Sequence, residues 1–419
     1  MVLELPSLAL PGLDKINKKK SLVDDWDWFS PKQSLGGNVN DFIETGWVGD
    51  FHLDKVLSVA LESGASDIHI TCGHPVAFTV NGDIEFRDEF VIPDTGVMFE
   101  LVETMMTHVQ YGDFIKDYEL GFAYEIRKGP YSGSRLRAKA GKSLGSEYLV
   151  FRTINDEIPS TESLEIEAEL KDWFTVRTGL ALICGSTGTG KSTTLASILR
   201  DIQLKRAVKI ITIENPIEYE YPEDGRALMV QREVGVDCVS FYDALTGAMR
   251  ESPDILLLGE VRDTEEVSEL LRAAETGHLA VSTMHTNSVA TTINRIQSLF
   301  SGNERDRILS TLSDTLVGIG NQILVKAKDG KGRFACRELL TIDSETRKMV
   351  AKGDSAAIRD YLITKKKTME YSLARAYLAG KCTKKEARNQ ATRKADFDSA
   401  LADLRHPKRD LSAYTIDVK

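Results

Sequence analysis

The sequence lacks long hydrophobic runs and cysteine pairs. No stretch of its 419 residues approaches the roughly 18 to 20 apolar residues that a membrane span requires. Its five cysteines form no Cys-x-x-Cys pair, which argues against a zinc ribbon or knuckle. The amino-terminal residues show no basic region followed by an apolar core and a cleavage pattern. We therefore expect a cytoplasmic protein with reduced thiols, held at any membrane by other components.

Positive charge is also scarce. The chain has 53 Lys and Arg against 63 Asp and Glu, for a formal net charge of -10. Proteins that coat duplex DNA usually have a basic domain, and binders of single strands interleave aromatic and basic residues. Neither pattern is present, so nucleic acid is not expected as a direct ligand. The hydrophobic share of 42% is ordinary for a globular protein of this size.

Changes in residue pattern divide the chain into five regions. Residues 1–45 show no helical or strand period, and we expect an amino-terminal extension. Residues 46–155 mix helical spacing with short strands around an Asn-Gly-Asp hairpin signal, which predicts a small α+β domain. A charged linker, 156–172, precedes region 173–345, where near-continuous apolar strands alternate with helices and indicate a parallel sheet buried on both faces. Residues 346–419 predict a helical carboxy-terminal region.

One motif predicts a nucleotide-binding loop. Residues 185–192 fit the pattern G-x-x-x-x-G-K-[ST] in full, between an apolar strand and a helical pattern, which is the context that this loop requires. Its glycines let backbone N–H groups turn toward phosphate oxygens, and the helix adds the positive end of its dipole. We expect Lys191 to reach the β- and γ-phosphates of ATP and Ser192 to hold Mg²⁺. The predicted nucleotide-binding residues are Gly185, Ser186, Thr187, Gly188, Thr189, Gly190, Lys191, Ser192 and Thr193.

Two carboxylates follow other apolar strands of the same region. Glu260 comes after strand 255–258, at the end of a parallel strand where such sheets bind ligands. Beside a phosphate-binding loop it is a candidate Walker B carboxylate that holds Mg²⁺ directly or through water. Glu214 follows strand 208–213. Its position is compatible with a base that polarises the attacking water and with an ordinary surface carboxylate, and spacing alone does not decide between them.

Two histidines flank a fourth apolar strand, 279–283. His285 follows this strand, near the place where a γ-phosphate would lie. A phosphate-sensing role and a packing or capping role are both compatible with that position. His278 precedes the strand, and the gap between the two histidines does not match the i, i+4 spacing of a zinc-binding pair.

Three arginines belong to predicted strands of the small α+β domain. Arg135 and Arg137 alternate along one strand and therefore share a face, and Arg152 belongs to another strand. They form either a solvated sheet face or a set of positive groups that reach the phosphates of a nucleotide bound elsewhere, as arginine fingers do.

Taken together, these segments resemble the PilT/GspE family of secretion ATPases, which are hexameric motors of type IV pili and of type II and type IV secretion. The resemblance covers roughly residues 50–345 and depends on several motifs in order, which is more specific than any single motif. The motifs are Ala65-Ser66-Asp67-Ile68-His69, the loop 185–192, an Asp box at 211–218, Gln231-Arg232-Glu233-Val234-Gly235, Gly259-Glu260-Val261-Arg262-Asp263, Ala273-Ala274-Glu275-Thr276-Gly277-His278 and a His box at 282–287.

The resemblance implies an α/β fold class. A smaller PAS-like α+β domain would precede a RecA-like P-loop ATPase domain with a parallel sheet, and a helical carboxy-terminal region would follow. It implies a homohexamer with ATP between the two domains. It also implies inner-membrane components of a secretion or pilus machine as partners, so that the protein is cytoplasmic and peripheral to the inner membrane through them.

The resemblance further implies roles for single residues. Glu214 would be the base for the attacking water and Glu260 the Walker B carboxylate. His285, and as a second candidate His278, would sense the phosphate. The residues that would supply positive charge from the first domain are Arg135, Arg137 and Arg152.

Several departures from the family pattern indicate to which subgroup of the family the chain is most similar. Asn215 stands where the Asp box often has Asp, which keeps an acceptor and loses a charge. The chain lacks the tetracysteine element of assembly-type members, which favours a retraction-type enzyme. The retraction enzymes' Ala-Ile-Arg-Asn-Leu-Ile-Arg-Glu box is not reproduced, and segments 337–340 and 343–350 look more like the ATPases of type IVB secretion and conjugation.

We therefore predict a hexameric motor ATPase of a type IVB-like secretion or conjugation machine or of a type IV pilus machine. A dedicated pilus retraction (twitching) ATPase is the first alternative. A nucleic-acid-dependent RecA-like translocase and a ring that docks and recruits in its ATP state are further alternatives.

Overall fold

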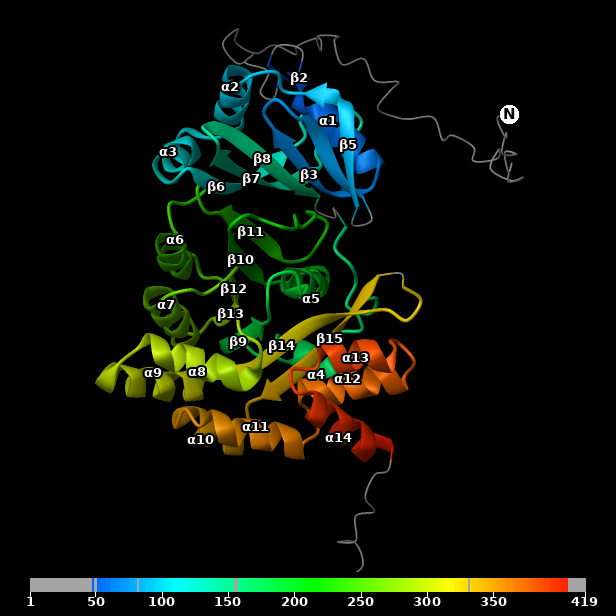
Figure 1. Cartoon of the computed structure of the whole chain (residues 1–419). Coiled ribbons are helices and arrows are strands. Elements are labelled where there is room, and N and C mark those ends of the chain that lie inside the picture. The colour runs from blue at the N-terminus through cyan, green and yellow to red at the C-terminus, as the bar shows by residue number, and fades with distance from the viewer. Residues whose placement is uncertain (1–46, 49–50, 81–82, 154–156, 331, 406–419) are drawn as a thin grey trace, which may run out of the picture. The chain divides into compact units, whose positions relative to one another are not determined.

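The structure is a computed structural model of the whole chain (Figure 1). The chain divides into two compact units, residues 1–154 and 155–419. The expected extension, residues 1–45, lies outside the described residues, as do Asn81 and Gly82 of the expected hairpin turn. The structure describes residues 47–48, 51–80, 83–153, 157–330 and 332–405.

Unit 1 is built on an antiparallel sheet. Its elements are β1 (Trp47–Val48), β2 (Phe51–His52), α1 (Leu53–Glu62), β3 (Ala65–Thr71), β4 (Pro75–Val80), β5 (Asp83–Val91), α2 (Thr95–Met105), α3 (His108–Asp117), β6 (Glu119–Glu125), β7 (Arg135–Ser143) and β8 (Ser146–Thr153). Six strands form the sheet, in the order β5-β4-β3-β8-β7-β6. The apolar sides of the three helices pack with one face of these strands in a single hydrophobic core.

Side-chain periodicity explains why this core lies on one face. In β7, Leu136 and Ala138 are buried, while Arg135 and Arg137 alternate with them and point to the other side. Residues 94–109 do not form one continuous helix: α2 ends at Met105, and the side chain of Thr107 begins α3 by accepting a hydrogen bond from the Gln110 backbone N–H. This capping box starts a new helix.

Unit 2 contains the second sheet. Its elements are α4 (Ala168–Asp172), β9 (Gly179–Cys184), α5 (Lys191–Lys205), β10 (Lys209–Glu214), β11 (Leu228–Glu233), α6 (Phe241–Ala248), the short 3-10 helix Met249–Glu251, β12 (Ile255–Leu258), α7 (Thr264–Glu275), β13 (Leu279–Met284), α8 (Val289–Leu299), α9 (Gly302–Thr315), β14 (Leu316–Lys326), β15 (Arg333–Thr341), α10 (Ser344–Ala351), α11 (Ser355–Thr364), α12 (Met369–Leu378), α13 (Lys384–Gln390) and α14 (Lys394–Arg405).

The seven strands of this sheet run in the order β11-β10-β12-β13-β9-β14-β15. Every neighbouring pair is parallel except β14 with β15. Helices cover both faces, with α6 and α7 on one side and α5 on the other (Figure 1). All six residues of β9 are consequently buried, which confirms the predicted parallel sheet.

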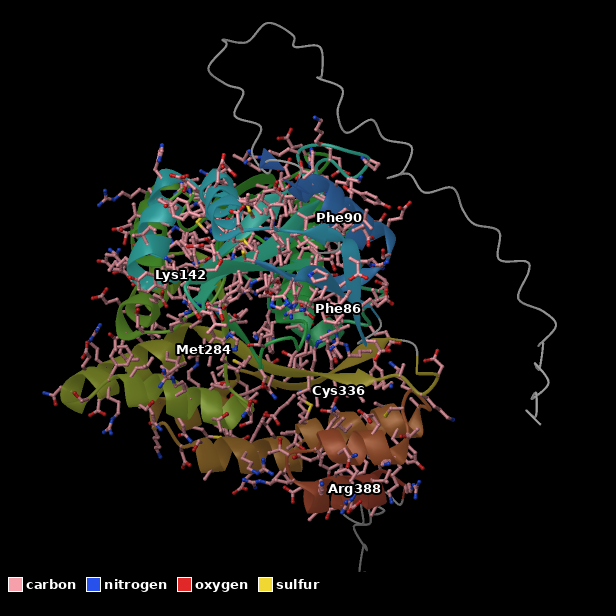
Figure 2. All side chains as sticks on the ribbon, turned by 45° about the horizontal axis from the view of Figure 1, so that its top comes forward. Phe86, Phe90, Lys142, Met284, Cys336 and Arg388 are labelled. Atoms are coloured by element: carbon pink, nitrogen blue, oxygen red, sulfur yellow. The ribbon has the colours of Figure 1, made fainter. Side chains whose placement is uncertain are left out.

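The helical carboxy-terminal region is part of unit 2 and packs on its β14–β15 hairpin. Leu373 of α12 and Phe397 of α14 share a core with Val325 and Cys336 of the β14–β15 hairpin. Cys336 is labelled in Figure 2. The predicted fold class is confirmed: an α/β unit with a parallel sheet, a smaller α+β unit before it and helices after it. Within the described residues, no helix has the length and apolar character needed to cross a bilayer.

Candidate nucleotide-binding site

The loop between β9 and α5 has the backbone of a phosphate cradle. Gly185, Gly188 and Gly190 have φ angles of 148°, 76° and 80°, which L side chains rarely adopt. A Cβ at Gly185 would also lie 2.5 Å from the carbonyl oxygen of Gln322. The loop therefore requires glycine both for its turn and for its close approach to β14. It leads directly into the amino end of α5, where unpaired N–H groups and the helix dipole favour an anion.

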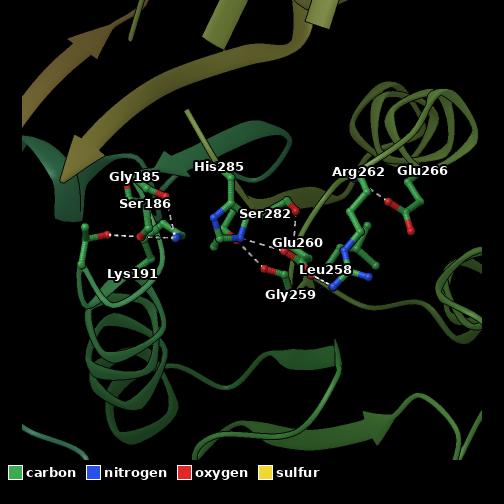
Figure 3. Close-up of polar contacts among 12 residues, drawn as sticks. Gly185, Ser186, Lys191, Leu258, Gly259, Glu260, Arg262, Glu266, Ser282 and His285 are labelled. Carbon is green, nitrogen blue, oxygen red and sulfur yellow. Dashed lines mark hydrogen bonds and ion pairs between the residues drawn. The ribbon is translucent and has the colours of Figure 1, made fainter. Parts of the chain in front are cut away.

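Lys191 lies folded against this loop. Its ammonium group is buried and donates to the carbonyl oxygens of Gly185 at 2.8 Å and Ser186 at 3.1 Å (Figure 3). Burial lowers the pKa of Lys191, although the Cys184 thiol and the negative charge of Glu218 act in the opposite direction. An anionic phosphate in the loop would provide the desolvated ammonium with the counter-charge that two carbonyl oxygens do not supply.

Glu260 lies beside this loop because of the strand order. β13 lies between β9 and β12, so His285, which follows β13, lies between Lys191 and Glu260 (Figure 3). His285 Nε2 is 2.9 Å from Glu260 Oε2, and Arg262 pairs with the other carboxylate oxygen. Burial, with the positive charges of Lys191 and Arg262, lowers the pKa of His285. A neutral imidazole then donates its Nε2–H to the carboxylate.

The turn that carries Glu260 is fixed by β13. Thr283 Oγ1 donates to the Gly259 carbonyl oxygen at 2.7 Å, and the Val261 N–H donates to the Thr283 carbonyl oxygen at 3.0 Å. The Arg262 N–H donates to Glu266 at 2.7 Å. These bonds hold the carboxylate on a rigid support, as a functional group requires.

The donor set fits Mg²⁺ only together with a nucleotide. No group of three or more His, Cys, Asp or Glu side chains able to hold a metal occurs among the residues that the structure describes. The predicted ligands Ser192 and Glu260 would offer two oxygen donors, and their role toward Mg²⁺ stays a prediction. Mg²⁺ prefers such sparse protein ligation, because it keeps several waters and completes its shell with phosphate oxygens.

Glu214 ends β10, the strand next to β12. Its carboxylate accepts a hydrogen bond from Thr212 Oγ1 at 2.8 Å. Burial raises its pKa to about 7, the Thr212 hydrogen bond lowers it, and the negative charge of Glu218 raises it further. A carboxyl with a pKa near neutrality is well matched to proton transfer at physiological pH.

Other predicted residues lie elsewhere. His278 lies at the amino end of β13, the opposite end of the strand from His285, and its Nδ1 contacts the Ala273 carbonyl oxygen at 3.0 Å. Arg135, Arg137 and Arg152 belong to unit 1. Arg152 pairs with Asp67 at 2.8 Å, and the expected role of the three arginines toward a nucleotide stays a prediction.

Sequence reasoning did not single out three contacts of the site, two of them made by the loop itself. Asn287 accepts a hydrogen bond from Ser186 at 3.2 Å, and Arg262 pairs with Glu260. Asn287 lies in the His box and Arg262 in the motif that contains Glu260. Their closeness in sequence to His285 and Glu260 could have indicated that they belong to the site. Gln322 donates to the Thr189 carbonyl oxygen at 2.7 Å. It lies on β14, far away in the chain, and no sequence pattern indicated it.

Comparison with known proteins gives a family and several relatives. The family model described as "Type II/IV secretion system protein" matches residues 158–389. The chain is 37% identical over 288 residues to the type IV pilus retraction ATPase PilT of Pseudomonas aeruginosa, a match that covers 69% of this chain and 82% of that protein.

Two solved structures are similar in fold. The pilus retraction motor PilT with bound ADP matches with a TM-score of 0.74 and 34% identity, over 83% of this chain and 99% of the other. The ATPase DotB of Legionella pneumophila matches with a TM-score of 0.72 and 28% identity, over 80% of this chain and 94% of the other.

Proposed function

This chain belongs to the type II/IV secretion system protein family and is an ATPase, and from that premise we propose that it is a hexameric, cytoplasmic motor of an inner-membrane machine. The machine is a type IVB-like secretion or conjugation system or a type IV pilus. The observation that supports hydrolysis best is that four groups lie at the carboxyl ends of parallel strands of one sheet: the loop after β9, Glu214 at the end of β10, Glu260 after β12 and His285 after β13.

Binding begins at the loop. Residues 185–193 hold the phosphates, and Lys191 moves its ammonium from the carbonyl oxygens of Gly185 and Ser186 to the β- and γ-phosphates. Ser192 and Glu260 would hold Mg²⁺, which neutralises phosphate charge when it is bound. His285 and Arg262 keep the Glu260 carboxylate in one place for this purpose.

Hydrolysis then uses Glu214 as the base. Its carboxylate accepts the proton of a water whose oxygen attacks the γ-phosphorus, the bond from that phosphorus to the bridging oxygen breaks, and ADP and phosphate form. His285 responds to the loss of the γ-phosphate. Arg135, Arg137 and Arg152 act as positive groups on the nucleotide in the assembled ring, as arginine fingers do in other phosphoryl-transfer enzymes.

Dedicated pilus retraction is the second candidate. The observation in its favour is the 37% identity to PilT, which extends over 82% of that protein. The type IVB-like assignment is instead supported by the similarity to DotB and by segments 337–340 and 343–350.

A single genetic experiment separates the two. A strain without this gene is complemented with wild type or with Lys191→Ala, and pilus retraction and substrate transfer are measured in parallel. Loss of transfer with intact retraction supports the type IVB-like machine, and the reverse result supports dedicated retraction. If neither process depends on Lys191, the motor function is contradicted.

The translocase alternative is tested in vitro. Purified protein is assayed for MgATP hydrolysis with and without single-stranded DNA, and its mass is measured with and without nucleotide. We expect a ring of six subunits and no stimulation. Many-fold stimulation by DNA would replace the motor of a membrane machine with a nucleic-acid translocase.

A further inference from the structure

A buried glutamine forms hydrogen bonds both to the phosphate-binding loop and to the helix that follows it. Gln322 of β14 is 1% exposed. Its Nε2–H donates to the Thr189 carbonyl oxygen at 2.7 Å, and its Oε1 accepts from Thr194 Oγ1 at 2.9 Å. Thr189 belongs to the loop and Thr194 to the first turn of α5. The side chain of Gln322 therefore connects β14 to the part of the molecule that must adjust when phosphate enters or leaves.

Arg337 extends this contact across the sheet. It lies opposite Gln322 in the β14–β15 ladder, so both side chains share a face. The Arg337 side chain is 3% exposed. Its Nε–H donates to Gln322 Oε1 at 2.7 Å, and a terminal nitrogen lies 3.3 Å from Thr194 Oγ1. The guanidinium is thus hydrogen-bonded both to Gln322, which holds the loop, and to the Thr194 hydroxyl that Gln322 also contacts.

The remaining branch of the guanidinium reaches a different part of the chain. It donates to Glu167 Oε2 at 2.9 Å. Glu167 lies directly before α4, in the segment 157–172 that opens unit 2 just after its boundary with unit 1 at Ile154. This segment is the first described part of unit 2.

Neighbouring acidic residues of the segment are attached differently. Glu165 pairs with Lys381 and Glu169 pairs with Lys367 at 2.6 Å. Both lysines belong to the helical carboxy-terminal region and border the cleft of about 400 Å³ over Arg337. Glu167 differs from these two because its partner is bonded to the loop contacts as well.

The hydrogen-bonded side chains of Gln322, Arg337 and Glu167 should move together. Arg337 is a buried cation with a rigid planar fork, and its bonds to Gln322 and Glu167 compensate its loss of water. If phosphate binding shifts Thr189 and Thr194, Gln322 must follow, because a buried polar group left without its partner is costly. Arg337 must follow Gln322 for the same reason, and it carries Glu167 with it.

We propose that Arg337, acting through Gln322, is a positioning residue that couples phosphate occupancy of the loop to the conformation of segment 157–172. The proposal rests on the proposed function in that it requires a nucleotide at the loop. It assigns a role to the Arg337-Glu338-Leu339-Leu340 segment beyond indicating the branch of the family. Through these contacts, which all lie within unit 2, a change at the nucleotide would reach the segment with which the described part of that unit begins.

The test uses a matched pair of substitutions in the full-length protein. Glu167→Gln removes the charge that meets Arg337, and Glu165→Gln makes the same chemical change two positions earlier, in an ion pair that does not reach the loop. Arg337→Lys and Arg337→Met complete the set. ADP affinity is measured by calorimetry, and amide hydrogen exchange of residues 160–172 is followed with and without MgADP. The Ile166 and Lys171 amides are hydrogen-bonded within this segment and report on it.

In the wild type and in Glu165→Gln, MgADP should change exchange across this segment by about threefold to tenfold. In Glu167→Gln and Arg337→Met the change should fall below about twofold, with ADP affinity kept within about threefold. In these two variants the kcat for ATP hydrolysis should fall without a matching rise in KM. Arg337→Lys should restore part of the response, because it keeps the charge and loses the fork.

The outcomes separate this proposal from the function on which it depends. If ADP does not bind the wild type, the proposed function fails. If ADP binds and exchange in segment 160–172 does not change, or if both glutamine variants respond alike, the coupling role of Arg337 is wrong while nucleotide binding stands. Should Arg337→Met fail to fold, Glu167→Gln still decides, because the side chain of Glu167 is 41% exposed and the amide oxygen of glutamine can still accept a hydrogen bond from the buried guanidinium.

Discussion

Each unit of this protein contains a carboxyl group whose pKa is raised by burial. In unit 1, Asp54 accepts hydrogen bonds from the Tyr124 hydroxyl at 2.7 Å and from the backbone N–H groups of Arg127 at 3.2 Å and Lys128 at 3.0 Å. In unit 2, Glu214 accepts from Thr212 at 2.8 Å. Both pKa values are raised chiefly by desolvation.

The charged neighbours of the two carboxyl groups have opposite signs. All the other influences on Asp54 lower its pKa: its three hydrogen bonds and the positive charge of Arg127 favour the carboxylate. Hydrogen bonds, among them the one from Thr212, also lower the pKa of Glu214, but its charged neighbour is Glu218, whose negative charge raises that pKa. A carboxylate that joins hydrogen-bond donors with a positive neighbour holds structure together, here α1 and the residues after β6. A carboxylate kept close to its titration point, at the sheet edge from which the phosphate-binding loop also begins, is suited to exchange a proton.

The largest effect should come from Glu214→Gln. Losing the base should lower kcat for MgATP hydrolysis by about 10² to 10⁴-fold, with ADP affinity unchanged, because the loop residues that hold phosphate are intact. Steady-state hydrolysis and calorimetry measure both quantities. The matched control is Glu223→Gln, an exposed residue after the same strand, which should leave kcat unchanged. Equal effects of the two substitutions would show that Glu214 has no special role.

Asp54→Asn should act on folding. The amide nitrogen cannot accept the hydrogen bonds that the second carboxylate oxygen receives, so the unfolding free energy of unit 1 should fall by about 2 to 3 kcal/mol. Urea denaturation followed by a signal from unit 1 measures it. Asp113→Asn, at an exposed site in α3, is the control and should change stability by less than about 0.5 kcal/mol. A stable Asp54→Asn protein would contradict the structural role.

The stability of Glu214→Gln should depend on pH relative to wild type. The pKa of Glu214 rises from 4.5 to about 7 on folding, so between these values the folded state binds more protons than the unfolded state. Wild-type stability therefore falls as pH rises through this window, whereas Gln does not titrate. The variant should be more stable than wild type by about 3 kcal/mol above pH 8 and similar below pH 4. If the stability difference between the variant and wild type were the same above pH 8 and below pH 4, the raised pKa of Glu214 would be contradicted.

Arg137→Ala should have the smallest effect and tests whether unit 1 contributes to catalysis. We expect about a tenfold loss of kcat with unfolding changed by less than about 0.5 kcal/mol, because Arg137 is exposed on its sheet face. Hydrolysis assays and urea denaturation give the two numbers. Loss of folded protein instead of activity would show that this arginine is structural.

The parallel sheet could be predicted because its central strands are apolar on both faces. The strands β9, β10, β12 and β13 each form a short apolar run, and their carboxyl ends carry the predicted loop, Glu214, Glu260 and His285. The edge strand β11 is only partly buried and was not predicted. β14 was missed for another reason: it carries the buried polar residues Asn321 and Gln322, which interrupt the apolar run.

The contacts that hold the loop from β14 and β15 could not be predicted. Gln322 and Thr189 are separated by 133 positions, and Arg337 and Glu167 by 170. Such pairs become neighbours only through the sheet order, which local periodicity does not determine. The catalytic roles of the individual residues and the boundaries of the five regions stay predictions.

The pH dependence of kcat/KM for MgATP hydrolysis by the wild-type protein tests the central claim most directly, because this parameter reports the titration of essential groups in the uncomplexed enzyme. If Glu214 is the base, activity should rise through a midpoint near its pKa of about 7, and the residual activity of Glu214→Gln should lack this step. A wild-type profile that is flat between about pH 6 and pH 8, or a Glu214→Gln protein that keeps the same step, would contradict a base at this position.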